Sequence, residues 1–201
     1  MKLTGIGILK WNGQETAPIF LGSAIDVSNF GYFQRPAVRE GIMFIARTIV
    51  QRTSPGQRQT VKNAEYFCHV YVTAETGLAA IVVADSEYPT TAAFSIISKV
   101  LEEFTGQAKD TWRAVEADSQ MAGPLLEPAL VKYQDHMQAD KIARIQKDLD
   151  ETKIILHQTI DSVLRRGEKL DALVDKSNDL SLASQMFYKQ ARKTNSCCNF
   201  M

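Results

Sequence analysis

Residues 149–187 read LDETKIILHQTIDSVLRRGEKLDALVDKSNDLSLASQMF, and their apolar pattern decides how the rest of the chain is interpreted. Steps of alternately three and four residues from Ile142 reach sixteen positions, of which ten are apolar and one is charged. The register one residue later holds five apolar side chains, and the register one residue earlier holds four. A 3.5-residue repeat of this length is typical of a left-handed coiled coil. The sixteen positions, called the seam below, are Ile142, Ile145, Leu149, Thr152, Leu156, Thr159, Val163, Arg166, Leu170, Leu173, Ser177, Leu180, Ser184, Phe187, Ala191 and Thr194.

The stretch that contains the seam is almost free of helix breakers. No proline follows Pro128, and Gly167 is the only glycine after Gly123. A helix over residues 142–194 would be about 80 Å long, which exceeds the width of a domain of about 135 residues. We therefore expect one long helix that packs with partner helices. The alternative is an amphipathic helix that packs on its own domain.

The one charged residue of the seam, Arg166, lies in its middle between Val163 and Leu170. A buried guanidinium without acceptors costs several kcal/mol, so partner helices should supply carbonyl or carboxylate oxygens at that layer. Identical helices would place like charges together, so the partners should be different chains. A polar layer of this kind fixes register and partner choice. The alternative is that Arg166 reaches solvent along its aliphatic stem.

The first part of the chain is punctuated by glycine and proline like a compact domain. Asn12-Gly13 separates two apolar runs and Glu75-Thr76-Gly77 separates another two, which predicts two hairpins. The order of strand, strand, helix, three strands, helix and short helix predicts a mostly antiparallel sheet with helices on both faces. The expected strands are 2–11, 19–25, 58–61, 66–72 and 78–84, and the expected helices are 36–52, 90–104 and 128–135.

Composition and motifs give little support to catalysis or to nucleic-acid binding. The 23 basic and 23 acidic residues cancel, which argues against a nucleic-acid partner. The sequence has no phosphate-binding loop, paired-histidine helix or nucleophile elbow, and the neighbours Cys68 and His69 should point to opposite faces of a strand. No apolar run is long enough for a membrane span, and the N-terminus does not resemble a signal peptide. We expect no enzymatic activity, no metal and no cofactor apart from covalent lipid.

The tail, Cys197-Cys198-Asn199-Phe200-Met201, has a cysteine four residues from the end and a terminal methionine. This pattern predicts farnesylation of Cys198, followed by removal of the last three residues and carboxymethylation, although Asn199 departs from the usual aliphatic position. The adjacent Cys197 is a candidate palmitate acceptor, and two lipids anchor a protein far more stably than one. Three basic residues just upstream, with no acid among them, favour an anionic membrane surface: Lys189, Arg192 and Lys193.

The seam and its arginine resemble an R-SNARE motif, with Arg166 as the ionic-layer arginine. The stretches FQRPAVREGIMFIARTIVQR, CHVYV, ADSEYP, LDETKIILH, RRGEKLD and ARKTNSCC make the whole chain resemble the lipid-anchored longin-domain R-SNAREs of the synaptobrevin-like v-SNARE superfamily. The resemblance implies an α+β longin (profilin-like) domain over residues 1–135, in which one helix and two helices sandwich five antiparallel strands. It also implies a coiled-coil R-SNARE helix over residues 138–196, followed by the lipidated tail.

The resemblance further implies membrane fusion as the function. Three Q-SNARE helices (Qa, Qb and Qc) would each contribute a glutamine to the Arg166 layer of a parallel four-helix bundle, and SNARE disassembly and tethering machinery would be further partners. The expected membranes are those of the Golgi, endosome, vacuole or lysosome and autophagosome and those derived from the endoplasmic reticulum, with a cytosolic reserve. A longin-type trafficking adaptor or tether that uses the coiled coil as a rod is the alternative.

The exposed seam and lipid of a cytosolic reserve should fold back onto the longin domain. We expect Phe44, which lies off the main apolar stripe of the helix 36–52, to mark this autoinhibitory dock; the resemblance places the aromatic position of the family's groove there. Ser177 and Ser184 are small core positions of the seam, so a phosphate on either should block bundle assembly.

Overall fold

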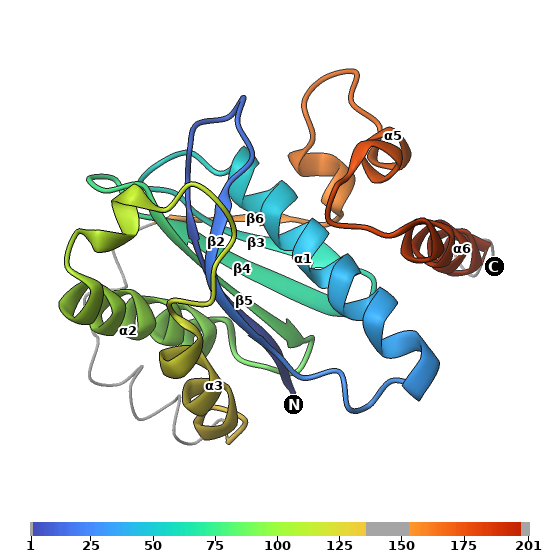
Figure 1. Cartoon of the computed structure of the whole chain (residues 1–201). Coiled ribbons are helices and arrows are strands. Elements are labelled where there is room, and N and C mark those ends of the chain that lie inside the picture. Colours follow the sequence, from blue (N-terminus) through green and yellow to red (C-terminus); the bar gives the residue numbers. More distant parts are fainter. Residues whose placement is uncertain (1, 136–152, 198–201) are drawn as a thin grey trace.

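The computed structural model describes residues 2–135 and 153–197 of the chain, and the side chains up to Lys193. Its centre is a six-stranded sheet in the order β2-β1-β5-β4-β3-β6 (Figure 1). All neighbouring strands are antiparallel except β6, which pairs parallel to β3. The first five strands are β1 (Leu3–Lys10), β2 (Ile19–Ile25), β3 (Arg58–Asn63), β4 (Tyr66–Val72) and β5 (Leu78–Asp85).

Helices cover both faces of this sheet (Figure 1). One face carries a single long helix and the other carries two, as the fold prediction required. Because both faces are covered, β1 and β5 are buried along nearly their whole length, which explains their unbroken apolar runs. The elements are η1 (Tyr32–Gln34) and α1 (Arg35–Arg52) on one face, and α2 (Thr90–Ala108), η2 (Thr111–Ala114) and α3 (Gly123–Lys132) on the other.

The last helix of the sandwich, α3, begins earlier than the sequence predicted. It starts at Gly123 with Pro124 in its first turn, whereas the expected start was Pro128, which instead lies inside the helix. Proline lacks a backbone N–H and fits the first turn, so two prolines four residues apart both suggest a helix start.

Two neighbouring residues of β4, Cys68 and His69, are buried on opposite faces of the sheet. Cys68 faces α1, and burial raises the pKa of its thiol to about 12. His69 faces α2, where its ring packs edge-on against Phe94 and its Nδ1 lies 3.0 Å from the Thr60 hydroxyl. Burial lowers the pKa of His69 to about 4, so this histidine is neutral at physiological pH. The opposite orientations agree with the prediction and mark both residues as core.

The C-terminal segment, residues 153–197, is not the one long helix that the heptad repeat predicted. It consists of short elements that follow α1 and the β3 edge of the sheet, which accounts for the sixth strand (Figure 1). The chain turns at Gly167, whose φ of 89° suits glycine. The apolar positions of the segment pack on the chain's own sheet domain (residues 2–135), so no partner helix is needed to bury them. The elements are β6 (Ile154–His157), η4 (Ile160–Val163), α5 (Leu170–Lys176) and α6 (Leu182–Cys197).

Candidate functional site

The contact between the C-terminal segment and the sheet domain is the candidate functional site, and α1 is its centre. The α6 helix packs against α1, where the Tyr188 and Phe44 rings meet edge to face with centroids 5.9 Å apart. The Tyr188 ring also lies over Gly41, where an added Cβ atom would be 3.6 Å from the ring, an ordinary van der Waals distance. Phe44 itself is 4% exposed. The arrangement with the segment in this place is called the closed form below.

A single apolar cluster joins the two parts of the closed form. On the sheet-domain side it contains α1 residues and the inner faces of β4 and β5. Four residues of the segment are buried in it, and four more pack against it while keeping some exposure. The buried four are Ile160, Leu170, Val174 and Leu180, and the partly exposed four are Val163, Leu164, Leu173 and Tyr188.

Arg47 of α1 connects three parts of the chain at the edge of this cluster. Its Nε lies 2.7 Å from a carboxylate oxygen of Asp179 in the segment, and its Nη2 lies 2.5 Å from a carboxylate oxygen of Asp118. The guanidinium also donates to the Pro18 carbonyl and lies over the Phe20 ring, 4.8 Å from its centroid. Charge-assisted pairs of this kind are roughly twice as strong as neutral hydrogen bonds, so Arg47 orients the segment as well as holding it.

A second ionic contact lies near the end of α1. The Arg52 guanidinium and the Glu168 carboxylate are 2.9 Å apart, and the backbone N–H of Arg165 donates to the same carboxylate at 2.9 Å. The Arg165 side chain reaches the Glu15 carboxylate at 2.8 Å and the Gln14 carbonyl at 2.8 Å. Arg165 and Glu168 are therefore held by the sheet domain, while Arg166 between them is exposed.

The start of α6 is held by Glu40, whose carboxylate accepts a hydrogen bond from the backbone N–H of Ser181 at 2.8 Å. Desolvation raises the pKa of Glu40, but hydrogen bonds from Ser181 and Ser184 outweigh it and leave a lowered pKa. The pKa of Glu168 is also lowered. Desolvation raises it, but hydrogen bonds from Arg165 and Arg52 outweigh that effect. Both carboxylates therefore stabilise the closed form in their charged state.

Acid is expected to weaken the closed form. A lowered pKa in the folded protein gives stability that is present above the ordinary glutamate value of 4.5 and is lost as pH falls through the folded value. Amide chemical shifts of α5 and α6 followed from pH 6 to pH 3 should report release of the segment. The sheet domain serves as the internal control, because hydrogen bonds from Ser28 lower the pKa of its Asp26 to about 2, below the range of the titration. Unchanged shifts of α5 and α6 across this range would contradict the prediction.

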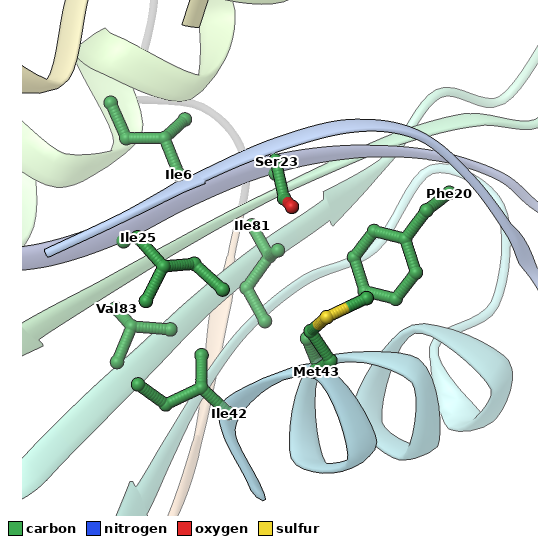
Figure 2. A pocket seen from close by; sticks show the side chains of 11 residues that line it. Ile6, Phe20, Ser23, Ile25, Ile42, Met43, Ile81 and Val83 are labelled. Atoms are coloured by element: carbon green, nitrogen blue, oxygen red, sulfur yellow. The ribbon is translucent and has the colours of Figure 1, made fainter. Parts of the chain in front are cut away.

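A groove of about 250 Å³ opens where the middle of α6 lies against the first turns of α1. Its walls are mostly apolar, and they come from α1, α6, β4 and the loop before α1: Phe30, Val38, Gly41, Tyr66, Phe187 and Ala191. Figure 2 shows a second and much smaller crevice of about 10 Å³ between α1 and the sheet, no larger than a single water needs. Its labelled side chains are Phe20, Ser23, Ile25, Ile42, Met43, Ile81 and Val83, with Ile6 pointing away from α1.

The structure divides the expected seam residues by exposure. Buried seam residues are Leu170, Leu180 and Ser184, and half-buried ones are Val163, Leu173, Ser177 and Phe187. Exposed ones are Leu156, Thr159, Arg166 and Ala191. The earlier seam positions Ile142, Ile145, Leu149 and Thr152, the side chains of Thr194 and Cys197, and all of Cys198 to Met201 lie outside the described residues.

Sequence reasoning missed the polar residues that hold the segment, namely Arg47, Asp179, Arg52, Glu168 and Glu40. Their partners are more than a hundred residues away, and no local pattern marks such pairs. A signal did exist for the apolar contacts. Ile160, Leu164, Val174 and Tyr188 are the described apolar residues one place after seam positions, and all four pack in or against the cluster.

Within residues 2–135 and 153–197, no helix is both long enough and apolar enough to cross a membrane, and no group of side chains suits a metal ion. A sheet with one helix on one face and two on the other, followed by a heptad segment with one central arginine, is the arrangement that the resemblance to longin-domain R-SNAREs implies.

Comparison with known proteins gives the same answer. Residues 27–128 match the family model of the longin regulated-SNARE-like domain, and residues 141–199 match the synaptobrevin family model. The chain is 52% identical to the VAMP-like protein YKT61 of Arabidopsis thaliana over 201 residues, and 42% identical to the synaptobrevin homolog YKT6 of Saccharomyces cerevisiae over 203 residues. All of both chains is covered in each case. The protein belongs to the synaptobrevin-like, longin-domain R-SNARE family, and its function is in vesicle trafficking.

Proposed function

We propose that this chain supplies the arginine-bearing helix of a parallel four-helix SNARE bundle that draws a vesicle and its target membrane together. Arg166 meets one glutamine from each of a Qa, a Qb and a Qc helix. Neutral amides accept hydrogen bonds from the guanidinium without forming a locked ion pair, which suits a bundle that is later taken apart. The observation that carries the proposal is the lone cation in the middle of an otherwise uncharged and mostly apolar seam.

The closed form is the inactive reserve of this SNARE. Leu170, Leu180 and Ser184 are buried against the sheet domain, and the same side chains would have to face partner helices in a bundle. One set of side chains cannot be buried in two places, so the sheet domain and the Q-SNARE helices compete. Phe44 and Arg47 contribute the apolar and the ionic part of this autoinhibitory contact.

Lipid decides the competition. Cys198 carries farnesyl and, after loss of Asn199 to Met201, a carboxymethyl group, while Cys197 carries palmitate. In the cytosol the prenyl chain lies in the groove between α1 and α6, whose apolar walls suit a hydrocarbon. Acylation of Cys197 gives the tail a second lipid, which anchors the tail stably in the membrane. The segment is then released from the sheet domain.

The protein acts without enzymatic turnover and without a cofactor other than these covalent lipids. Its membranes are those of the Golgi, endosome, vacuole or lysosome and autophagosome and those derived from the endoplasmic reticulum, where it is peripheral and lipid-anchored. SNARE disassembly and tethering machinery are further partners.

A pull-down with residues 137–196 tests the bundle, and Arg166→Leu distinguishes a SNARE from a structural rod. We expect the wild-type segment to capture three different helices, each with a glutamine at the level of Arg166. The leucine variant should capture them less selectively, since three amides would then face a hydrocarbon side chain without a partner. A rod would instead bind more tightly after the change, because an apolar side chain would replace a buried charge. Tighter binding with unchanged partners would contradict the proposal.

A further inference from the structure

The segment carries two sets of apolar side chains that differ by one residue in register. The first set is the seam. The second set consists of the apolar residues one place later along the described chain: Ile160, Leu164, Val174 and Tyr188. In a regular helix one residue corresponds to a rotation of about 100°, so the second set lies beside the seam rather than in it.

Three members of the second set would form a straight line on a bundle helix. Ile160, Val174 and Tyr188 are spaced by 14 residues, which is two heptads, so they would follow one flank of the helix next to the seam. Side chains on a flank are at the margin of a four-helix core.

The closed form uses the second set at every described position but the seam only in part, since Leu170 and Leu180 of the seam are buried as well. Ile160 is 4% exposed and Val174 is fully buried, whereas the seam residue Leu156 is 57% exposed. Tyr188 packs on Phe44 and over Gly41. The second set therefore contributes to the contact with the sheet domain at all four described positions, while Arg166 and Leu156 of the seam are exposed.

The broken secondary structure makes this possible. A continuous helix can bury only one face, but β6, η4, α5 and α6 are separate pieces joined by turns, and each piece presents its own side to α1 and the sheet. Ile160 comes from η4, Val174 from α5 and Tyr188 from α6. The contact is thus assembled from residues that a bundle helix would not place together.

We infer that Ile160, Leu164, Val174 and Tyr188 form an interaction surface whose partner is the sheet domain of the same chain, and which lies outside the core layers of the four-helix bundle. This inference rests on the proposed function. Its consequence is that the stability of the closed form can change without any change in the bundle.

The test uses two variants of the full chain that are matched in chemistry. Ile160→Ser with Val174→Ser removes two buried members of the surface, and Leu156→Ser removes an exposed seam residue. Amide hydrogen exchange of β6, α5 and α6 measures opening of the closed form. The stability of the bundle is measured separately. Each variant is assembled with a set of recombinant Qa, Qb and Qc motifs that binds the wild-type chain, and the guanidinium concentration at which half of the complex dissociates is recorded.

We expect each variant to affect one of the two measurements and not the other. Loss of each buried side chain should speed exchange of the segment amides about 10- to 100-fold, with the dissociation midpoint of the bundle unchanged. Leu156→Ser should lower that midpoint and leave exchange within about twofold of wild type. Tyr188→Ser is a second variant on the surface and should behave like the serine pair at Ile160 and Val174.

Different results would contradict the interaction surface and the proposed SNARE function. If the Ile160 and Val174 variant lowers the bundle midpoint as much as Leu156→Ser does, or leaves exchange unchanged, the interaction surface is wrong and the SNARE function stands. If no set of Q-SNARE motifs assembles with the wild-type chain, the proposed function itself is wrong.

Discussion

Phe44→Glu is expected to release the C-terminal segment and to move the protein from the cytosol to membranes. Phe44 is 4% exposed, contacts Tyr188, and lies in the apolar cluster that joins the two parts of the closed form. An unpaired carboxylate buried at this point costs several kcal/mol, and each 1.4 kcal/mol changes a population tenfold. The open form should therefore gain about 100-fold or more in population. Fractionation of cells and amide exchange of α5 and α6 measure the two consequences.

Two controls separate release of the segment from damage to the sheet domain. Phe44→Leu keeps an apolar side chain and should leave most of the protein closed. Phe44→Glu combined with Cys198→Ser should stay in the cytosol, because the open form then lacks the lipid that holds it on a membrane. Amides of β1 and β5 should remain protected in every variant. An unchanged cytosolic fraction of Phe44→Glu, with the segment still protected, would rule out the dock.

The sheet domain was largely predictable from sequence because its signals are local. Asn12-Gly13 and Glu75-Thr76-Gly77 mark two hairpins, and both lie between observed strands. The start of α1 next to Pro36 follows from the preference of proline for a first helical turn. The start of α3 was missed because Pro124 and Pro128 give the same local signal, and only the packing of α3 on β2 and β1 decides between them.

The conformation of the C-terminal segment was not predictable from its repeat. A heptad pattern identifies which side chains need burial, but it does not say whether a partner helix or the chain's own α1 buries them. The ion pairs of Arg47 with Asp179 and of Arg52 with Glu168 join residues that are far apart in sequence. The apolar residues outside the seam, such as Val174, served only to show how well the register of the repeat is defined, although Val174 is fully buried against the sheet domain.

Ser184→Asp is expected to produce a protein that opens but cannot assemble. Ser184 is 2% exposed, and its hydroxyl lowers the pKa of Glu40, whose carboxylate also accepts from Ser181. An aspartate there would bury a second negative charge beside Glu40, which disfavours the closed form by several kcal/mol. The same residue is a small seam position, so a charge would equally be buried in the bundle. Faster amide exchange of α6, together with loss of assembly with Q-SNARE motifs, would verify both effects.

Ser177→Asp supplies the matched comparison, because Ser177 is a seam position that is only half-buried in the closed form. Its hydroxyl oxygen accepts from the backbone N–H of Asp179 at 3.1 Å, and a carboxylate can replace that acceptor. This variant should block assembly while leaving amide exchange closer to wild type. Ser184→Ala, which removes the hydroxyl without adding charge, should preserve assembly. Normal assembly of the protein with both Ser177→Asp and Ser184→Asp would show that these positions are not buried core layers, and phosphorylation there could then not regulate the bundle.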